Sequence, residues 1–175
     1  MTITNLVLPV NTPVRIGQGF NGSFTHKLFP DLKVDDRYSL DFMGELGDRI
    51  YAVAPGTVSL LKIDGKDKDA YHGKDVQKGK DAAKHTNYIA IDHGDFFSLY
   101  MHLPEGNNGL NFEIGAPVTE RFPIGYIGQT GWSTAPHLHF AICAKTDDGW
   151  RRTISHSFRD YDGPLEDTVI NSHLY

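Results

Sequence analysis

Short runs of alternating apolar and polar residues, separated by Gly, Pro and Asn, are the feature of this chain that most restricts its fold. Alternation with a period of two is typical of strands that bury one face, and we find no heptads and no long stretch of helical periodicity. Gly94 and Asp95 are expected to form a two-residue hairpin turn. The pattern predicts a mostly β, antiparallel fold with strands over residues 49–54, 57–63, 87–93, 96–103, 124–128 and 137–144, and a weaker candidate over 153–158.

The length of the chain indicates how it is organised. At 175 residues it has the size of a single domain, large enough to bury a core without covalent staples. Its single cysteine, Cys143, excludes an internal disulfide. Residues 64–84 carry charges of both signs without periodicity, which predicts an exposed loop, either a solvated insertion or a flap that binds substrate or a partner. Residues 151–175 are expected to form a C-terminal extension.

Charge and hydropathy exclude some classes of protein. The net charge of −5 and the pI of about 5.9 argue against a protein whose main role is non-specific nucleic-acid binding. No transmembrane segment is expected. Residues 1–10 lack a basic segment and a small-residue cleavage site, so we expect either a cytoplasmic protein or a mature form whose signal was removed. Neither a coiled coil nor an exposed apolar stripe predicts an oligomeric state.

The sequence Pro-His-Leu-His-Phe at 136–140 is the sharpest local motif. On a strand, His137 and His139 project from one face, while Leu138 and Phe140 project from the other and are expected in the core. Two imidazoles side by side suit a zinc site or an acid–base pair. The motif alone is weak evidence, but the flanking apolar residues fix which face carries the histidines.

A second histidine motif is Tyr-Met-His-Leu at 100–103. Alternation would place Tyr100 and His102 on one face of a strand. Met101 and Leu103 would then lie on the other face. His102 is either a hydrogen-bonded structural histidine or a catalytic one.

Two further residues complete a candidate metal site. Asp41 lies between Leu40 and Phe42 in a strand-like run, so its carboxylate should point away from the core. A turn-rich stretch at 19–26 ends at His26, which joins Asp41 and His139 in the candidate set of ligands. A set of two histidines and one aspartate suits zinc, which keeps three protein ligands and water in catalytic sites, whereas Mg²⁺ and Ca²⁺ prefer oxygen ligands. The sequence has no H-E-x-x-H helix.

These motifs together resemble the LytM/lysostaphin-type zinc endopeptidases, a family of peptidoglycan hydrolases with a duplicated hybrid motif fold. The resemblance covers about residues 17–145. The last matching stretch is highly specific, because a turn of small residues, a proline and the H-x-H motif follow one another directly in the sequence. The matching stretches, in the family's order, are residues 19–26, 38–42, 51–58, 91–94 with 100–103, and 127–140.

The resemblance implies a fold, a cofactor and a site. The fold would be an antiparallel sheet groove on a barrel-sandwich-hybrid-like core. One Zn²⁺ per chain would be held by His26, Asp41 and His139, with His102 and His137 as the catalytic pair. The substrate would be a peptide or peptidoglycan, and the protein would act in the periplasm or outside the cell.

The chain departs from many relatives at one point. Those relatives place the first histidine ligand four residues before the aspartate, where this chain has Arg37. Others use a histidine after a Gly-rich turn, as His26 is here. If His26 is not a ligand, His72 or His85 from the charged segment is the alternative.

Two other functions compete with a peptidase. One is a metal-free binding or regulatory module with the same fold, although every candidate ligand is present here. The other is a lipoyl-like carrier domain, which needs a lysine at a tight hairpin tip, a setting that Lys62 lacks. Aromatic residues are expected to line a peptide groove, with Trp132 the best candidate and Phe20, Phe24, Tyr38 and Tyr126 as others.

Overall fold

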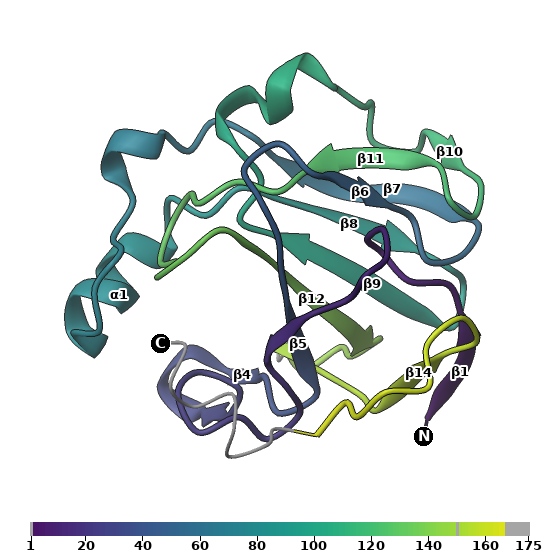
Figure 1. The fold of residues 1–175 in the computed structure, drawn as a ribbon, viewed down its shortest axis with the longest axis horizontal. Helices are drawn as coiled ribbons and strands as arrows, with labels where there is room; N and C mark the ends of the chain where they lie inside the picture. The colour runs from purple at the N-terminus through teal and green to yellow at the C-terminus, as the bar shows by residue number, and fades with distance from the viewer. Residues whose placement is uncertain (1, 150, 167–175) are drawn as a thin grey trace.

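A seven-stranded sheet is the centre of the fold in the computed structural model, which describes residues 2–149 and 151–166 (Figure 1). All of its neighbouring strands run antiparallel, which confirms the predicted class. In order across the sheet the strands are β10 (Pro117–Val118), β7 (Gly56–Lys62), β8 (Tyr88–Asp92), β9 (Phe96–Met101), β12 (His137–Ala144), β5 (Ser39–Met43) and β2 (Ile16–Gln18).

Smaller elements surround this sheet. Three short strands form a separate sheet in the order β13 (Arg151–Arg152), β4 (Val34–Asp35) and β3 (Leu28–Phe29). Two further pairs are β11 (Pro123–Tyr126) with β6 (Arg49–Tyr51), and β1 (Ile3–Leu6) with β14 (His156–Phe158). Helix α1 (Val76–Ala83) and β4 lie on one side of the molecule, and β1 and β14 lie on the other (Figure 1). Short 3₁₀ turns cover Pro30–Leu32, Asp67–Asp69 and Glu105–Gly109.

One face of the main sheet packs into the hydrophobic core. Leu138, Phe140 and Ile142 of β12 are fully buried there, as alternation predicted. Tyr100 of β9 is also fully buried, and its hydroxyl accepts a hydrogen bond from the backbone N–H of Val53 at 3.0 Å. This bond satisfies the polar end of a large core side chain and ties β9 to the segment after β6.

The opposite face carries smaller side chains. Ala90, Leu99, Ala141 and Cys143 form a second buried cluster there. Burial raises the pKa of the Cys143 thiol to about 12, so it stays protonated and inert, as expected for a packed cysteine. Tyr88, Phe97 and Met101 pack against this cluster.

Residues 64–84 are not only an exposed loop. They include α1, whose first turn is capped by the Asp75 carboxylate accepting from the backbone N–H of Lys78. Gly79 lets α1 approach the indole of Trp132 so closely that a Cβ at this position would lie 2.1 Å from a ring atom. The predicted loop was wrong here because an eight-residue helix whose buried residues are Gly79 and Ala82 shows no apolar stripe.

The C-terminal extension is built into the fold as far as residue 166. β13 pairs in parallel with β4, and β14 pairs in parallel with β1. The candidate strand over 153–158 is therefore confirmed only for its second half. Residues 167–175 of the predicted extension lie outside the described residues.

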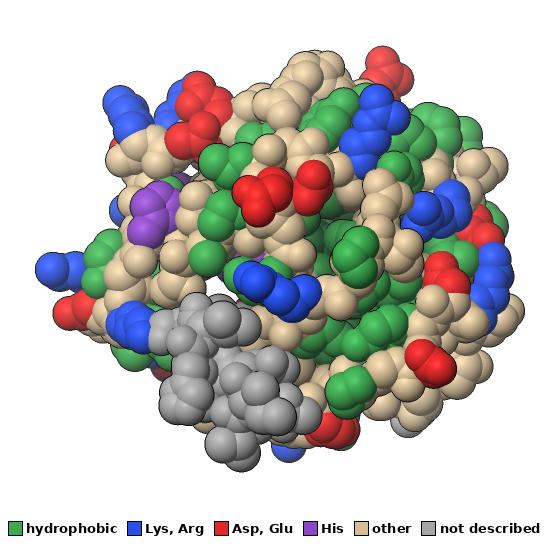
Figure 2. All heavy atoms as spheres, viewed as in Figure 1, with side chains coloured by type: hydrophobic (Ala, Val, Ile, Leu, Met, Phe, Trp, Pro, Cys, Tyr) green, Lys and Arg blue, Asp and Glu red, His purple; other side chains and the backbone are tan. Residues whose placement is uncertain are grey.

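Charged side chains of both signs are interspersed on the face shown in Figure 2 rather than gathered into one basic patch. Ion pairs at the surface of the molecule include Lys66 with Glu105 and Lys145 with Asp92. Within residues 2–149 and 151–166, no helix is long and apolar enough to cross a bilayer.

His156 is a buried histidine outside the motifs that we singled out. Its ring packs edge-on against Phe20, Phe140 and Phe158. Its Nδ1–H donates to the Ile154 carbonyl at 3.0 Å, and its Nε2 is buried without a hydrogen-bond partner among the described residues. Burial lowers the pKa of His156 from 6.5 to about 4, so the ring is neutral in the folded protein at neutral pH.

We expect His156 to make stability depend on pH. Between pH 6.5 and 4 the His156 side chain is protonated in the unfolded chain but neutral in the folded protein. The unfolding free energy therefore falls as the pH falls. The loss attributable to this residue is roughly 3 kcal/mol across that window. Urea unfolding of chelator-treated His156→Gln should therefore show a flatter pH dependence than wild type. Equal slopes for the two proteins would contradict this origin.

Candidate metal centre

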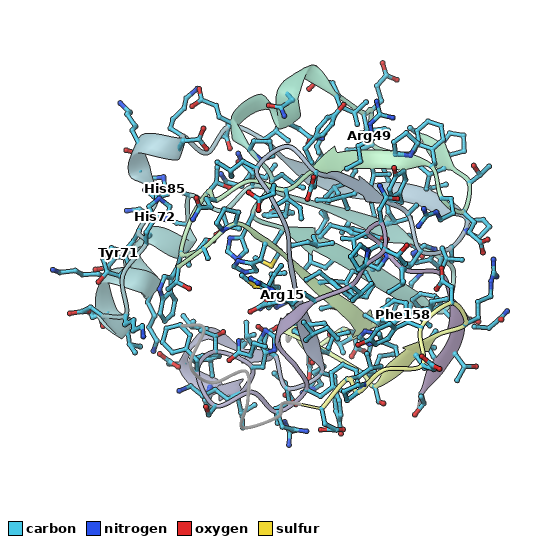
Figure 3. The ribbon with its side chains drawn as sticks, in the orientation of Figure 1. Arg15, Arg49, Tyr71, His72, His85 and Phe158 are labelled. Carbon is cyan, nitrogen blue, oxygen red and sulfur yellow. The ribbon has the colours of Figure 1, made fainter. Side chains whose placement is uncertain are left out.

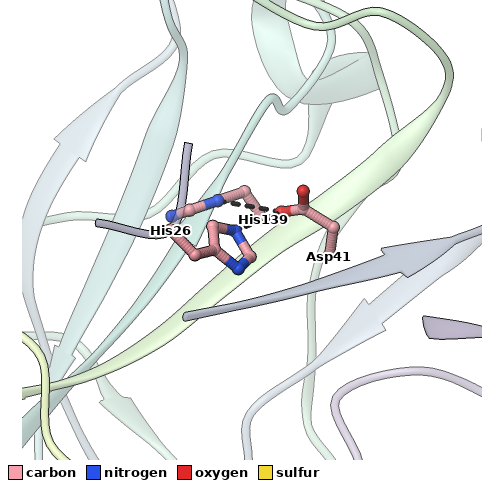
Figure 4. Close-up of side chains that lie close together, drawn as sticks. All are labelled: His26, Asp41 and His139. Carbon is pink, nitrogen blue, oxygen red and sulfur yellow. Dashed lines mark hydrogen bonds and ion pairs between the residues drawn. The ribbon is translucent and has the colours of Figure 1, made fainter. Parts of the chain in front are cut away.

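Strand register brings Asp41 and His139 face to face. They are direct partners in the pairing of β5 with β12, so their side chains leave the sheet on the same side. Asp41 Oδ1 lies 2.9 Å from His139 Nδ1 (Figure 4). Both residues are buried, at 3% and 6% exposure. The predicted faces of the two strands are thus confirmed.

Gln18, which the sequence analysis did not identify, places His26. It is the partner of Asp41 on β2, and its Nε2–H donates to Asp41 Oδ2 at 3.2 Å. Its Oε1 accepts the backbone N–H groups of Phe24 and Thr25 at 3.1 and 3.0 Å. These hydrogen bonds tie the turn before His26 to Gln18 on β2. His26 Nε2 consequently lies 3.2 Å from Asp41 Oδ1.

The three residues predicted as ligands can share one ion. His26, Asp41 and His139 each offer one ligand atom, and these atoms all lie within 4.8 Å of one another. Two imidazole nitrogens and one carboxylate oxygen in a buried position fit zinc better than a cation that prefers oxygen ligands alone. The residues present therefore fit the implied metal.

Backbone carbonyls fix the ring orientation of three histidines at the site. A carbonyl can only accept, so each of these rings must carry its proton on Nδ1 and leave Nε2 as an acceptor. The three bonds, all 2.8 Å long, run from His26 to Gly19, from His102 to Thr130 and from His137 to Ala135. The fold thus presents three imidazoles with Nε2 available for a metal or a proton.

His102 reaches the site by a different route from the predicted one. The strand ends at Met101, and His102 has a left-handed backbone with φ of 65°. This turn breaks the alternation, so Tyr100 lies in the core while Met101, the β9 partner of His139, faces the site together with His102. The prediction that Tyr100 and His102 share a face was wrong for this reason. The His102 ring centroid lies 4.7 Å from that of His137.

Burial and charge set the protonation of the two remaining histidines. Burial, reinforced by His137 and His139, lowers the pKa of His102 to about 3. Burial also lowers the pKa of His137, although the Asp41 carboxylate partly opposes this. His137 Nε2 lies 3.6 Å from Asp41 Oδ1. Both rings are therefore neutral at neutral pH.

The carboxylates favour positive charge at the centre. Burial alone would raise the pKa of Asp41, but the histidines around it, His26 and His137 foremost, hold it well below its usual range. Burial would likewise lower the pKa of His139, yet Asp36 and Asp41 outweigh it and raise this pKa to about 9. Without a bound metal the site thus retains a proton between two carboxylates, which is an electrostatic environment that suits a cation.

A pocket of about 140 Å³ opens above these residues. Its apolar walls come from the segment around β3 and β4 on one side and from α1 and Trp132 on the other. Of the predicted groove aromatics, Phe24 and Trp132 line it and contact each other with ring centroids 5.4 Å apart. Phe20 and Tyr38 instead pack with the core cluster.

The alternative ligands lie elsewhere. His72 Nδ1–H donates to the Ser133 carbonyl at 2.6 Å, and His85 Nδ1 lies 3.9 Å from Asp69 Oδ2. Both are near α1 at the outer side of the molecule (Figure 3). Arg37, four residues before Asp41, pairs with Asp35 at 2.6 Å. His26 is thus the histidine that completes the cluster.

Comparison with known proteins agrees with this geometry. The model of peptidase family M23 matches residues 36–149. The chain belongs to peptidase family M23. The matched residues include Asp41, His102, His137 and His139, whereas His26 precedes them, so the family match and the position of His26 are separate observations.

Characterised M23 relatives share part of their length with this chain. Peptidoglycan DD-endopeptidase ShyA of Vibrio cholerae is 25% identical over 138 residues, which are 78% of this chain and 26% of that protein. Lysostaphin of Staphylococcus simulans is 30% identical over 105 residues, which are 59% of this chain and 17% of that protein. The chain therefore spans less than a third of the length of either relative.

Solved structures show the same fold. A zinc-containing peptidase from Vibrio cholerae matches with a TM-score of 0.53 and 23% identity, over 84% of this chain and 37% of that one. The catalytic domain of the prophage-encoded M23 protein EnpA from Enterococcus faecalis matches with a TM-score of 0.55 and 17% identity, over 84% of this chain and 93% of that one. The antiparallel fold expected from the family is thus confirmed.

Proposed function

We propose that the protein is a zinc-dependent endopeptidase that hydrolyses peptide bonds in peptidoglycan cross-bridges or stem peptides. The observation that carries this proposal is the convergence of His26, Asp41 and His139 within 4.8 Å beneath a pocket that also exposes His102 and His137. Zinc held by the three ligands would polarise the scissile carbonyl and lower the pKa of an attacking water molecule.

His102 and His137 would handle the protons of the reaction. Each ring is neutral and has Nδ1–H bound to a backbone carbonyl, so in each ring Nε2 carries the lone pair that can accept a proton. A neutral Nε2 can accept a proton from water and later return it to the leaving amine, and the protonated ring can stabilise the developing negative charge on the carbonyl oxygen. The two rings stand next to each other, so both can contact the same substrate group.

The substrate class rests on the relatives together with the pocket. The relative ShyA is a peptidoglycan DD-endopeptidase, and a further relative, ALE-1 from Staphylococcus capitis, is a glycyl-glycine endopeptidase. Peptidoglycan as substrate would place the protein in the periplasm or outside the cell. The pocket of about 140 Å³ beside the metal ligands is the space that we assign to a substrate residue next to the scissile bond.

Chelation tests the proposal directly. We expect treatment with a strong chelator to abolish the release of soluble peptides from purified sacculi, and about one equivalent of zinc per chain to restore it. Mg²⁺ should not restore it, because the site offers two imidazoles rather than an all-oxygen shell. A sample given chelator already saturated with zinc controls for effects on the substrate. Release that persists after complete chelation would refute zinc dependence.

The competing functions have less support. A metal-free binding module would have no need to keep all three ligand residues buried and converging. A lipoyl-like carrier would need an exposed lysine at a hairpin tip, but Lys62 ends β7 and its Nζ pairs with Asp64 at 2.7 Å. The pocket and its histidines have no role in such a carrier.

A further inference from the structure

His139 differs from the other histidines of the site in how its second nitrogen is held. His26, His102 and His137 each have Nδ1 bound to a backbone carbonyl. His139 instead turns Nδ1 toward Asp41, so its Nε2 points to the opposite side of the ring. There Nε2 lies 3.3 Å from Asp36 Oδ2, at ion-pair distance although not aligned as a hydrogen bond.

Asp36 is itself fixed from several sides. It is 5% exposed, and its Oδ1 accepts the Ser39 hydroxyl at 2.8 Å. Arg151 Nη2 lies 3.2 Å from the same Oδ1. These contacts occupy one carboxylate oxygen and leave the other directed at His139. Burying a charged carboxylate costs folding free energy unless the charge is paired and hydrogen-bonded. Ser39 and Arg151 supply these partners for Asp36.

Arg151 comes from beyond the part of the chain that matches the M23 family model, which ends at residue 149. It lies on β13, which pairs with β4 just before Asp36. Its Nη1 also lies 3.3 Å from the Met101 sulfur at the edge of the pocket. Arg151 thus brings the C-terminal extension to the proposed metal centre.

We propose that Asp36, held by Arg151 and Ser39, is the positioning residue that fixes His139 as an Nδ1 metal ligand. This inference rests on the proposed function. A histidine that binds a metal through one nitrogen needs an acceptor for the proton on the other, and a carboxylate in this place orients the ring and makes it a better donor to the metal. Asp36 cannot share that metal, because it faces the other nitrogen of the ring.

Zinc affinity of the full chain tests the role of Asp36. Competition with a chromophoric chelator should show that Asp36→Asn and Asp36→Ala weaken zinc binding by about 10- to 100-fold, with the larger loss for alanine. Arg151→Gln should weaken it in the same direction but less. The matched controls are Asp35→Asn and Arg152→Gln, which change the residues next to Asp36 and Arg151. Asp35 pairs with Arg37, and Arg152 pairs with Asp148. Both controls should bind zinc as wild type does.

A second readout separates positioning from general stability. In the ¹⁵N NMR spectrum of the zinc-loaded protein, the His139 ring should show a protonated Nε2 and a metal-bound Nδ1. Asp36→Asn keeps the shape of the side chain, so it is expected to fold while the Nε2–H signal shifts and exchanges faster with solvent. Circular dichroism and thermal unfolding of the metal-free variants verify the fold.

The outcomes are distinct. Wild-type zinc affinity in a folded Asp36→Asn and Asp36→Ala would overturn the positioning role and leave the proposed function intact. Failure of the wild-type chain to bind zinc at all would overturn both. Equal losses in the variants and in the Asp35→Asn control would show a general effect of removing charge near β4, which would also overturn the specific role of Asp36.

Discussion

Replacing Asp41 by alanine is expected to remove both the bound zinc and the peptidase activity. Asp41 Oδ1 lies 2.9 Å from His139 Nδ1, 3.2 Å from His26 Nε2 and 3.6 Å from His137 Nε2, so one oxygen links all three rings. Without it the site loses a ligand and the negative charge that favours a cation there. Removing a carboxylate that only orients a metal ligand costs about 10- to 100-fold in metal affinity, so the loss of a ligand itself should exceed about 100-fold.

Metal content by mass spectrometry, measured beside peptide release from sacculi, checks this expectation. Asp41→Asn serves as a second variant of nearly the same shape, in case the alanine variant folds poorly. Asp92→Ala is the matched control, because Asp92 is also a strand aspartate but pairs with Lys145 away from the site. An Asp41→Ala protein that keeps about one zinc per chain would exclude Asp41 as a ligand.

The second large effect is expected at His102, and it separates catalysis from metal binding. His102→Ala should keep wild-type zinc content but lose about 10²- to 10⁴-fold in turnover, the usual contribution of general acid–base catalysis. His102→Asn is the better-matched variant, since asparagine tolerates the left-handed backbone that His102 adopts at φ 65°. Both variants should show the same loss of turnover if the activity depends on the imidazole ring of His102.

His85→Gln controls for the removal of a histidine near the pocket, because His85 lies beside α1 and pairs with Asp69. It should retain both zinc and turnover. If His102→Ala and His102→Asn turn over substrate at the wild-type rate, the proton-transfer role would pass to His137 alone. Loss of zinc from these variants would instead place His102 among the ligands.

Sequence patterns predicted the central sheet well where large apolar side chains alternate with polar or small ones along a strand. β12 occupies residues 137–144 as expected, and the β8–β9 hairpin turns at Gly94, whose φ is 93°. In both cases one face of the strand packs in the core, so the alternation of side chains along the sequence indicates directly which residues face the core. β1 and β13 are only four and two residues long and pair with distant segments, so no local pattern could reveal them.

The candidate site was predictable in part. The H-x-H motif and the run around Asp41 indicated the faces that carry His137, His139 and Asp41, and family resemblance implied His26 and His102. The local backbone at His102 was not predictable, because a single left-handed residue reverses the alternation after β9. Gln18, Asp36 and Arg151 gave no signal at all, because their roles depend on register between strands far apart in the sequence.

The two ways of holding histidines in this site differ in what mutation can change. The acceptors for His26, His102 and His137 are main-chain carbonyls, which every amino acid possesses, so no substitution of a side chain deletes them. The acceptor that we propose for His139, the Asp36 carboxylate, belongs to a side chain and can be altered by a single codon. Sequence variation at residues 36 and 151 is therefore a route by which such a protein could adjust its hold on the metal while its catalytic imidazoles keep their orientation.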